Sequence, residues 1–405
     1  MNFGKKVVTA NGENNKMHNC LLIRTADIKI SDIAWGLLEN GYECDIYDLN
    51  CNVLDENEEE ALNLERFLKG NVFHFIFSMD FSPTISYVCE KLGIIYISWI
   101  YDSPLQSLYS KQAFNQVNFF FVFDKKLTEW GKKRGIHNIF YLPLAANVTK
   151  MGQINISIQD EKKYRCGVSF VGSGYTEEIF DKYYELMEHN YRKELELIIN
   201  EIIGKWDGEE RLSGALSEEI IKEFNRLSNG SAENLLGVPE RVYFEDNLLS
   251  KIVAHRERRM MMEKLSYLNP RWYGSGNDKS EYIPGVQYFD RLSYEQEIPK
   301  AYYLSRINLS TCLHSIVSGV PLRVFDIMGA GGFIITNYQP ELEELFEIGK
   351  EIVVYHNFDE MKELVEYFLQ HEEERMKILI SGYRRVSENY SYKVAVKKIF
   401  DNVLK

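Results

Sequence analysis

Short apolar runs alternate with amphipathic stretches along the first third of the chain. From Asn19 onward, the runs NCLLIRT, ECDIYDLN and VFHFIFSMD are separated by ISDIAWGLLENGY and DENEEEALNLERFLKG, in which apolar residues recur at helical spacing. Strands that alternate with helices through short connections form a parallel sheet with helices on both faces. The pattern therefore predicts an α/β, Rossmann-like domain over residues 1–150.

The same alternation returns after the polar stretch NVTKMGQINISIQDEKKY. RCGVSFVGSGY indicates a buried strand that ends in a Gly-Ser-Gly turn, and RWYGSG, VQYFD, INLST, GGFIITN and EIVVYHN continue the strand pattern. We expect a second Rossmann-like domain over residues 151–388, with a helical insertion over about 176–268. Residues 389–405 are expected to form a helix that crosses back to the first domain.

Length and charge bound the class of protein. A chain of 405 residues is longer than one core usually organises, so two domains are expected. The 60 acidic and 47 basic residues give a net charge of −13, which disfavours broad attraction to nucleic acid or to an anionic membrane. The predicted partners therefore exclude nucleic acid, and any phosphate group must be bound by a local basic site.

The cysteines and the N-terminal residues bear on the compartment. Six cysteines show no CxxC pairing, and MNFGKKVVTANGENNKM lacks an apolar leader segment. No apolar run approaches the ~20 residues that a membrane-spanning helix needs. We expect a cytoplasmic protein without disulfides, structural zinc or a membrane span.

The stretch SGVPLRVFDIMGAGGFIITN, which begins at Ser318, carries the most informative chemistry. It predicts a loop, a helix with Pro321 in its first turn, and a strand, so the loop presents free N–H groups at the positive end of a helix. Gly319 allows close approach of a ligand, and Arg323 could bind the same anion with two hydrogen bonds. Asp326, on the same helix face, could accept hydrogen bonds from two vicinal hydroxyls. Together they suit a nucleoside diphosphate; the alternative is a surface ion pair on a packing helix.

The segment INLSTCLHSIVSGVPLRVFDIMGAGGFIITNYQPELEELFEIGKEIVVY resembles the donor-binding core of GT-B glycosyltransferases, specifically the spore-maturation (CgeB-like) group. In that group the helix reads R-x-F-E and is followed by a small-Gly-Gly run and a P-E-L segment. Gly331, Gly332, Pro340 and Glu341 match this pattern, whereas Asp326 replaces the glutamate. ISWIYDSPLQSLY, FVFDKKLTEWGKKRG and FYLPLAAN resemble the N-terminal half of these proteins, and RCGVSFVGSGY resembles the opening strand of their donor domain.

The resemblance implies two Rossmann-like domains that face each other across a cleft. The C-terminal domain would bind a nucleotide-diphosphate sugar, with a UDP-sugar favoured, and the N-terminal domain an acceptor hydroxyl. In the wider clan, the position of Asp326 carries a glutamate that binds the ribose, and a glutamate eight residues earlier contacts the sugar. Ser318 stands at that earlier position here, which argues against a retaining mechanism of the usual type.

Two aspartates are candidates for the base that deprotonates the acceptor. Asp102 in WIYDSP ends a predicted strand beside Pro104, and Asp80 in SMDFSP ends the preceding strand. Ligand sites of α/β sheets lie at these strand ends, and a general base must reach the acceptor hydroxyl. We predict Asp102 as the base and Asp80 as its rival, while a turn aspartate that caps the next helix remains the alternative for Asp102.

Further donor contacts are predicted at loop ends. The Gly172–Ser173 turn could touch a phosphate or the acceptor, Tyr273 beside Gly274 could stack on the base, and Glu344 could accept hydroxyls of the sugar. Plain turns, core packing and a surface carboxylate are the respective alternatives. His314 and Ser315 complete this set, because they lie in the predicted phosphate loop. The basic run HRERR (255–259) is interpreted as a solvated helix face.

Absent motifs narrow the reaction. The sequence contains no DxD, no GxGxxG after a strand and no GxxxxGK[ST], so metal-dependent single-domain transferases, dinucleotide dehydrogenases and P-loop NTPases lose their main evidence. We predict a metal-independent hexosyltransferase with no cofactor besides its nucleotide-sugar co-substrate. Its acceptor could be a protein, a cell-envelope glycan or a small molecule. A nucleotide-sugar epimerase or hydrolase and a non-catalytic GT-B-like binding protein are the alternatives, and the oligomeric state stays open.

Overall fold

The computed structural model describes residues 18–25, 29–53, 56–175, 183–228, 237–274 and 282–404. The chain divides into two compact units. The first takes in the described residues of Met1–Pro143 and Tyr392–Lys405, together with Gly237, and the second those of Leu144–Asn234 and Val238–Ser391. Each unit is built around its own sheet, so the predicted α/β class with two Rossmann-like domains is confirmed.

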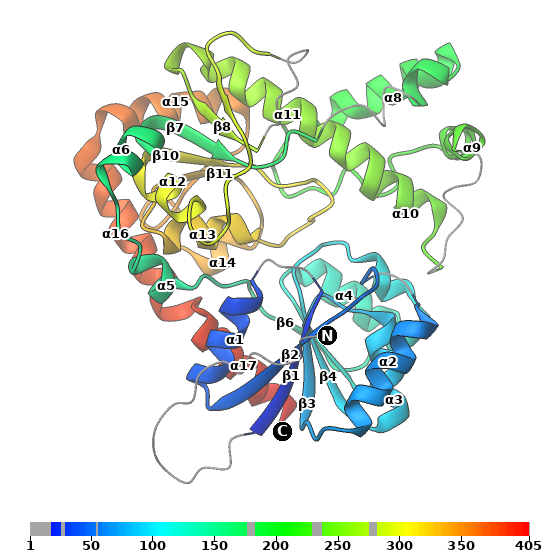
Figure 1. Cartoon of the computed structure of the whole chain (residues 1–405). Coiled ribbons are helices and arrows are strands. Elements are labelled where there is room, and N and C mark those ends of the chain that lie inside the picture. The colour runs from blue at the N-terminus through cyan, green and yellow to red at the C-terminus, as the bar shows by residue number, and fades with distance from the viewer. Residues whose placement is uncertain are drawn as a thin grey trace. The chain divides into compact units, whose positions relative to one another are not determined.

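The first unit contains six parallel strands in the order β2-β1-β3-β4-β5-β6 (Figure 1). Their bounds are β1 His18–Arg24, β2 Tyr42–Asp48, β3 Phe75–Met79, β4 Ile95–Ile100, β5 Asn118–Val122 and β6 Ile139–Tyr141. The helices are α1 Ile30–Glu39, α2 Glu58–Lys69, α3 Pro83–Leu92, α4 Lys125–Lys133 and α17 Tyr392–Val403, with 3₁₀ turns η1 Gln106–Tyr109 and η2 Lys111–Phe114. Strand order reverses between β1 and β3, which makes their carboxyl ends the switch point of this sheet.

Helices cover both faces of the first sheet, which explains why its central strands are almost wholly apolar. In Figure 1, α1 and α17 lie on one side, and α2 and α3 on the other. The last helix packs closely on α1, because a Cβ added at Gly36 would lie 3.0 Å from the Val396 side chain. Phe400 also stacks on Tyr42, with ring centroids 3.9 Å apart. The C-terminal end of the chain is thereby part of the first unit.

The second unit also has six parallel strands, in the order β12-β11-β10-β7-β8-β9. Their bounds are β7 Cys166–Val171, β8 Arg271–Tyr273, β9 Gln287–Phe289, β10 Ser305–Ser310, β11 Ile334–Asn337 and β12 Val353–Tyr355. The helices outside the insertion are α5 Val148–Gly152, α6 Ile158–Tyr164, α12 Ile298–Leu304, α13 Leu322–Gly329, α14 Leu342–Leu345, α15 Phe358–Gln370 and α16 Glu372–Asn389. Numbered within the unit, the strand order is 3-2-1-4-5-6, the Rossmann order, with its switch point between β7 and β10.

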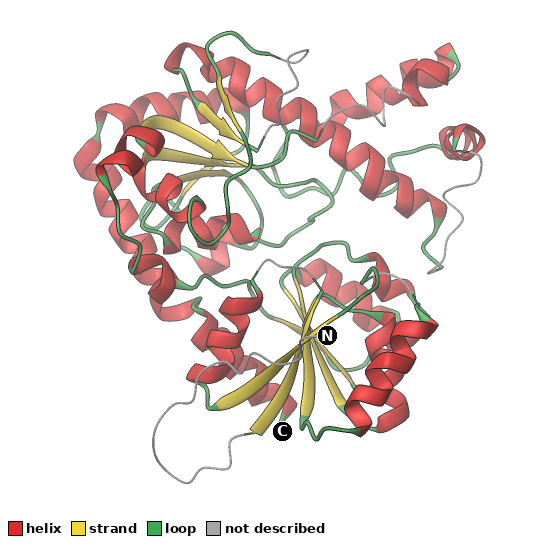
Figure 2. Ribbon diagram, viewed as in Figure 1, coloured by secondary structure: helices red, strands yellow, loops and turns green. Residues whose placement is uncertain are grey.

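A helical segment separates β7 from β8 (Figure 2). It contains α8 His189–Ile202, α9 Glu218–Leu227, α10 Glu240–Phe244, the π-turn η3 Glu245–Leu249, α11 Ser250–Leu265 and the 3₁₀ turn η4 Ser266–Leu268. The segment has a hydrophobic cluster of its own, in which Ile199, Phe224 and Phe244 are buried. Within it, α10, η3 and α11 follow one another without a break, so α11 extends from this cluster to the sheet, where Met261 and Leu265 join the core.

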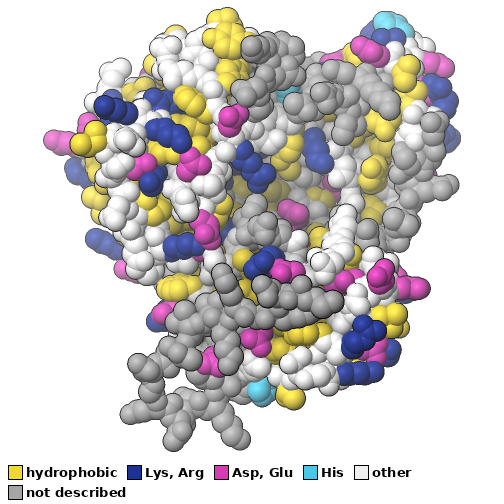
Figure 3. Space-filling model, in the orientation of Figure 1, with side chains coloured by type: hydrophobic (Ala, Val, Ile, Leu, Met, Phe, Trp, Pro, Cys, Tyr) yellow, Lys and Arg dark blue, Asp and Glu magenta, His cyan; other side chains and the backbone are white. Residues whose placement is uncertain are grey.

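The surface carries both signs of charge. On the face shown in Figure 3, acidic and basic side chains intermingle rather than forming one large patch. No helix among the described residues is long and apolar enough to cross a membrane.

Candidate donor and base sites

Glycines draw the carboxyl ends of β7 and β8 together. The Gly172 N–H donates to Tyr273 O at 2.9 Å, and the Trp272 indole N–H donates to Gly172 O at 3.0 Å. Gly274 has a φ of +94°, and a Cβ there would lie 3.2 Å from Gly172 O. A Cβ on Gly172 would lie 3.0 Å from an Arg323 nitrogen. The structure thus brings Gly172, Gly274 and Arg323 to one place, the β7 side of the switch point.

Two arginines flank the Phe170 ring at this end of β7. The guanidinium of Arg323 lies 5.2 Å from the ring centroid and that of Arg258 lies 5.4 Å from it. Arg323 donates to Thr311 O at 3.3 Å, and Arg258 donates to Ser173 O at 2.6 Å. Because both guanidinium groups are held by neutral carbonyl groups here, the site concentrates positive charge where an anion could bind.

One of the two guanidinium groups, that of Arg258, is buried, which is rare for a charged side chain. Arg258 is only 3% exposed, and its Nε has no hydrogen-bond partner. Desolvation, together with repulsion from Arg323, lowers the pKa of Arg258 to about 10 despite the opposing effect of Tyr175. Burying the Arg258 charge beside the partly exposed charge of Arg323 costs free energy that a bound anion would recover. A diphosphate, with two phosphate groups for two guanidinium groups, fits this arrangement.

Helix α11 supplies residues that the sequence interpretation assigned to solvent. His255 and Glu257 are 2% and 0% exposed, as buried as Arg258, so the prediction that HRERR is a solvated face is wrong. His255 Nδ1 lies 2.7 Å from Gly174 O. The signal was present in the flanking residues, because apolar side chains such as Ile252 and Met261 occur around the whole helix, which indicates a buried helix.

The loop after β10 is fixed from several sides. His314 Nε2 lies 2.7 Å from Glu257 Oε1, and its ring is parallel to the Trp206 indole, with centroids 6.0 Å apart. Glu257 also accepts the Gly204 N–H at 2.8 Å. The Ser250 hydroxyl donates to Ser315 at 3.3 Å, which ties the loop to α11. His314 and Ser315 are therefore held at the β10 side of the switch point.

A carboxylate enters the same loop from an unexpected position. The Ser318 hydroxyl donates to Glu341 Oε1 at 2.8 Å, and the Glu341 N–H donates to Ser318 O at 3.3 Å. Both side chains are buried, and so is the adjacent Gly319. In the sequence, Glu341 stands out only as part of the P-E-L motif. Ser318, which stands where the resemblance led us to look for a glutamate, is in contact with a buried glutamate.

Helix α13 follows this loop. Pro321 is its N-cap residue rather than a residue of its first turn, and no described side chain caps the helix. Asp326 is 3% exposed, so a surface ion pair does not describe it. Its two carboxylate oxygens accept hydrogen bonds from the Tyr294 hydroxyl at 3.0 and 2.9 Å. Tyr294 was not among the predicted residues.

The structure does not gather all predicted donor residues at the switch point. Gly331 and Gly332 lie beyond the far end of α13, where Gly331 adopts a φ of +75° and donates to Met328 O. A Cβ on Gly332 would lie 2.8 Å from Tyr302 O, so tight packing requires glycine there. The Tyr273 ring is buried and stacks on Phe289, which is the core-packing alternative, and Glu344 is exposed on α14.

The candidate bases lie at neighbouring strand ends in the first unit. Asp80 follows β3 at the switch point with a φ of 56°, and its Oδ1 accepts the Tyr101 N–H at 2.7 Å and the Asp102 N–H at 3.3 Å. Burial, and then the charge of Asp102, raise the pKa of Asp80 to about 7 against these hydrogen bonds. Asp102 itself is exposed after β4. A pKa near neutrality suits a general base, so Asp80 becomes the preferred candidate, while the roles of Asp80 and Asp102 both stay predictions.

No described group of three or more His, Cys, Asp and Glu side chains is arranged to hold a metal ion. In the second unit, the switch point instead offers guanidinium groups, a histidine, hydroxyls and backbone N–H groups. This set of donors suits an anion.

Comparisons with known proteins agree with the fold. Residues 256–401 match the family described as glycosyl transferase-like. Comparison with curated proteins finds no matching sequence. The GT-B fold also appears in similar solved structures, beginning with a glycosyltransferase from Rickettsia africae that is 10% identical, with a TM-score of 0.53 and coverage of 96% of this chain and 99% of that one.

Two further structures show the same architecture. Anabaena HepE in complex with UDP-glucose is 7% identical, with a TM-score of 0.56 over 95% of this chain and 99% of its own. Sucrose-phosphate synthase from Thermosynechococcus elongatus is 10% identical, with a TM-score of 0.50 and coverage of 96% of this chain and 99% of its own. At these identities the likeness shows the fold alone. The fold is that of the GT-B glycosyltransferases, and the C-terminal part of the chain carries the glycosyl transferase-like match.

Proposed function

We propose that this chain is a glycosyltransferase that moves a hexose from a nucleotide-diphosphate sugar, a UDP-sugar in the favoured case, to an acceptor hydroxyl. The observation that carries the proposal is the pair Arg258 and Arg323 on the Phe170 ring, at the switch point of a Rossmann sheet. The glycosyl transferase-like match over residues 256–401 supports it. A solved relative of the fold, Anabaena HepE, binds UDP-glucose. Within this class, we propose that the chain belongs to the spore-maturation (CgeB-like) group that its donor-binding segment resembles.

In this proposal, the second unit binds the donor. Arg258, Arg323 and the N–H groups at the start of α13 hold the diphosphate and stabilise its charge when it leaves. Asp326, with Tyr294, is assigned to the ribose hydroxyls. The Ser318–Glu341 pair and His314 are assigned to the sugar, because buried carboxylate and imidazole groups can orient sugar hydroxyls.

The first unit is assigned to the acceptor. Asp80 takes the proton from the acceptor hydroxyl. At the same time, the oxygen of that hydroxyl attacks the anomeric carbon of the sugar, and the bond between this carbon and the diphosphate breaks. A base that acts during a single displacement leads to inversion at the anomeric carbon. The acceptor is a hydroxyl of a protein, a cell-envelope glycan or a small molecule.

Nucleotide binding provides the first test. A ligand at a hundred times its Kd adds about 2.7 kcal/mol to the free energy of unfolding, so UDP is expected to raise the melting temperature by several degrees. UDP release in the presence of an acceptor would then be measured, and the product analysed with and without acceptor. Sugar epimerisation or hydrolysis without acceptor would support those alternatives, and binding without turnover across a panel of acceptors would favour a binding protein.

Chelation is expected to leave transfer activity unchanged. The proposed site meets the diphosphate charge with Arg258, Arg323 and a helix N-terminus rather than with a carboxylate-bound cation. Activity would be measured after dialysis against EDTA and again after addition of Mn²⁺ or Mg²⁺. Loss of activity that either ion restores would contradict the metal-independent scheme.

A further inference from the structure

A pocket of about 790 Å³ opens in the second unit away from the proposed donor site. Its lining includes Arg165 just before β7, Ser305 and Arg306 at the start of β10, and residues of α16. It therefore lies at the amino ends of the strands, whereas the switch-point residues lie at their carboxyl ends. Its volume falls within the 300–1,000 Å³ typical of small-molecule sites.

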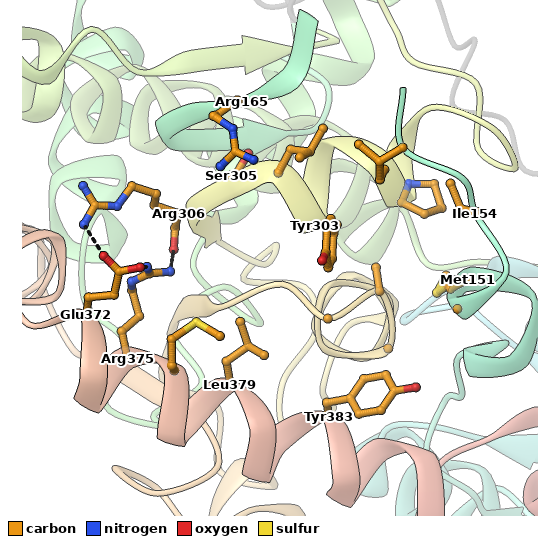
Figure 4. Close-up of a pocket in the computed structure, with 18 residues that line it drawn as sticks. Met151, Ile154, Arg165, Tyr303, Ser305, Arg306, Glu372, Arg375, Leu379 and Tyr383 are labelled. Atoms are coloured by element: carbon orange, nitrogen blue, oxygen red, sulfur yellow. Dashed lines mark hydrogen bonds and ion pairs between the residues drawn. The ribbon is translucent and has the colours of Figure 1, made fainter. Parts of the chain in front are cut away.

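One end of the pocket is basic. Arg306 of β10 and Arg375 of α16 lie beside Glu372, whereas Arg165, just before β7, lies nearer Ser305, as Figure 4 shows. Glu372 lies 3.7 Å from Arg306 and 3.6 Å from Arg375, so a single carboxylate is shared at long range between two guanidinium groups. Arg165 has its own partner in Glu161 on α6, 2.6 Å from its Nη2. Positive charge therefore exceeds negative charge along this wall.

Arg375 is the buried arginine of this basic end. It is 5% exposed, its Nη1 donates to Arg306 O at 2.9 Å, and its Nε has no hydrogen-bond partner. Figure 4 shows its guanidinium group directed from α16 towards Arg306, on the wall of the pocket. Burial, and then Arg306, lower the pKa of Arg375. A buried arginine beside a second arginine is the kind of arrangement that an anion stabilises.

The other end of the pocket is aromatic and apolar. Tyr303 on α12 is 58% exposed, and Tyr383 on α16 is 37% exposed. Both line the pocket together with Met151, Ile154 and Leu379, and Figure 4 shows the two tyrosines at separate points of its lining. Exposed rings without an aromatic partner among the described residues offer surface that a planar or apolar group can cover.

We propose that this pocket is a second binding site of the chain, for a small phosphate monoester with an aromatic or apolar body. The phosphate binds Arg306 and Arg375 in place of the long contacts that both make to the exposed Glu372, and the body lies against Tyr303 and Tyr383. The proposal uses none of the residues assigned to the nucleotide sugar and stands whether or not the chain transfers sugars.

Phenyl phosphate is the probe, with binding measured by calorimetry on the full chain. All titrations use an Arg323→Ala background, because the donor site could also bind a phosphate ester. Saturable binding is expected in that background. Arg306→Ala and Tyr303→Ala are each expected to weaken it at least tenfold, since one removes charge and the other an exposed ring. Lys377→Ala, which removes an exposed cation from the same helix α16, is the matched control and should leave the Kd unchanged.

Inorganic phosphate separates the two ends of the pocket. It should bind at least tenfold more weakly than phenyl phosphate, because it cannot cover the tyrosines. Equal affinities would remove the aromatic end from the site. The proposal is overturned if phenyl phosphate does not bind in the Arg323→Ala background, or if neither Arg306→Ala nor Tyr303→Ala changes its affinity. Circular dichroism of each variant confirms that the fold is intact.

Discussion

Replacing Asp80 with asparagine is expected to lower the rate of sugar transfer by 10²- to 10⁴-fold, the range typical of a lost general base. Donor affinity should stay nearly unchanged, because the residues assigned to the donor belong to the other unit. The measurement is single-turnover transfer beside UDP binding by calorimetry. Near-normal turnover in Asp80→Asn would remove the base from this position, and a product with retained configuration would contradict the single displacement.

The pH profile gives this prediction a sharper form. A base acts when ionised, so the transfer rate should rise as pH increases through about 7, where Asp80 loses its proton. Asp102→Asn is the matched control. Because the Asp102 charge raises the pKa of Asp80, its removal should shift the acidic limb to lower pH while leaving most of the maximal rate. If Asp102→Asn is inactive and Asp80→Asn active, the roles are exchanged.

The pH dependence of stability should reveal the ionisation of Asp80 without any measurement of activity. Asp80 has a higher pKa in the folded protein than the ordinary value of about 3.9, so the folded state binds its proton more tightly. The free energy of unfolding therefore falls as pH rises from about 4 to about 7, because the unfolded state gives up this proton first. Above about pH 7 the group is ionised in both states, so the loss of stability stays constant. Asp80→Asn should accordingly gain melting temperature relative to the parent protein at pH 8, and much less at pH 5.

Arg323→Ala is expected to weaken UDP binding by about 1.5 to 3 kcal/mol, the value of a hydrogen bond to a charged group. This corresponds to roughly a 10- to 150-fold increase in Kd. Arg323 is partly exposed, so the fold should tolerate the change. Arg258→Gln is expected to act in the same direction, since its guanidinium lies on the same ring.

Arg256→Ala provides the control for the arginine variants. It lies on α11 two residues before Arg258, but its guanidinium pairs with Glu196 of α8 at 2.8 Å. It should leave the Kd for UDP unchanged. Unchanged affinity in Arg323→Ala would return that residue to a packing role, and an equal loss in all three variants would indicate a general effect on the insertion.

Local pattern was enough to predict the class of fold. Strand-length apolar runs alternating with helical periodicity predict parallel sheets, and β3, β7, β8 and β11 fall within the expected runs. The pattern could not separate Asp80 from Asp102 as candidate bases, because both end a strand and strand order is a tertiary property. Only pairing shows that β3 borders the reversal in the first sheet.

Sequence pattern could group the candidate donor residues only where they lie close in sequence. Arg323, Ser318, Gly319 and His314 belong to one loop and helix, and Gly172 follows a recognisable strand. The partners that orient them were missed, because Glu257 and Glu341 lie 57 and 23 residues from His314 and Ser318. Such contacts depend on tertiary packing, which local periodicity does not encode. Gly331 and Gly332 were misplaced for the converse reason, since a glycine pair beside a binding helix resembles a binding loop.

Helix α11 begins in the insertion, which has its own hydrophobic cluster, and ends in the core of the second unit. His255, Glu257 and Arg258 all belong to it, so the proposed donor site would be complete only while this helix is docked on the sheet. Any undocked population would raise the apparent Kd for nucleotide in proportion. Conversely, a nucleotide that binds Arg258 should stabilise the docked helix. Binding should then slow amide hydrogen exchange along α11, including at residues that the nucleotide does not touch. The docking equilibrium of the insertion would then set the fraction of molecules that can bind nucleotide.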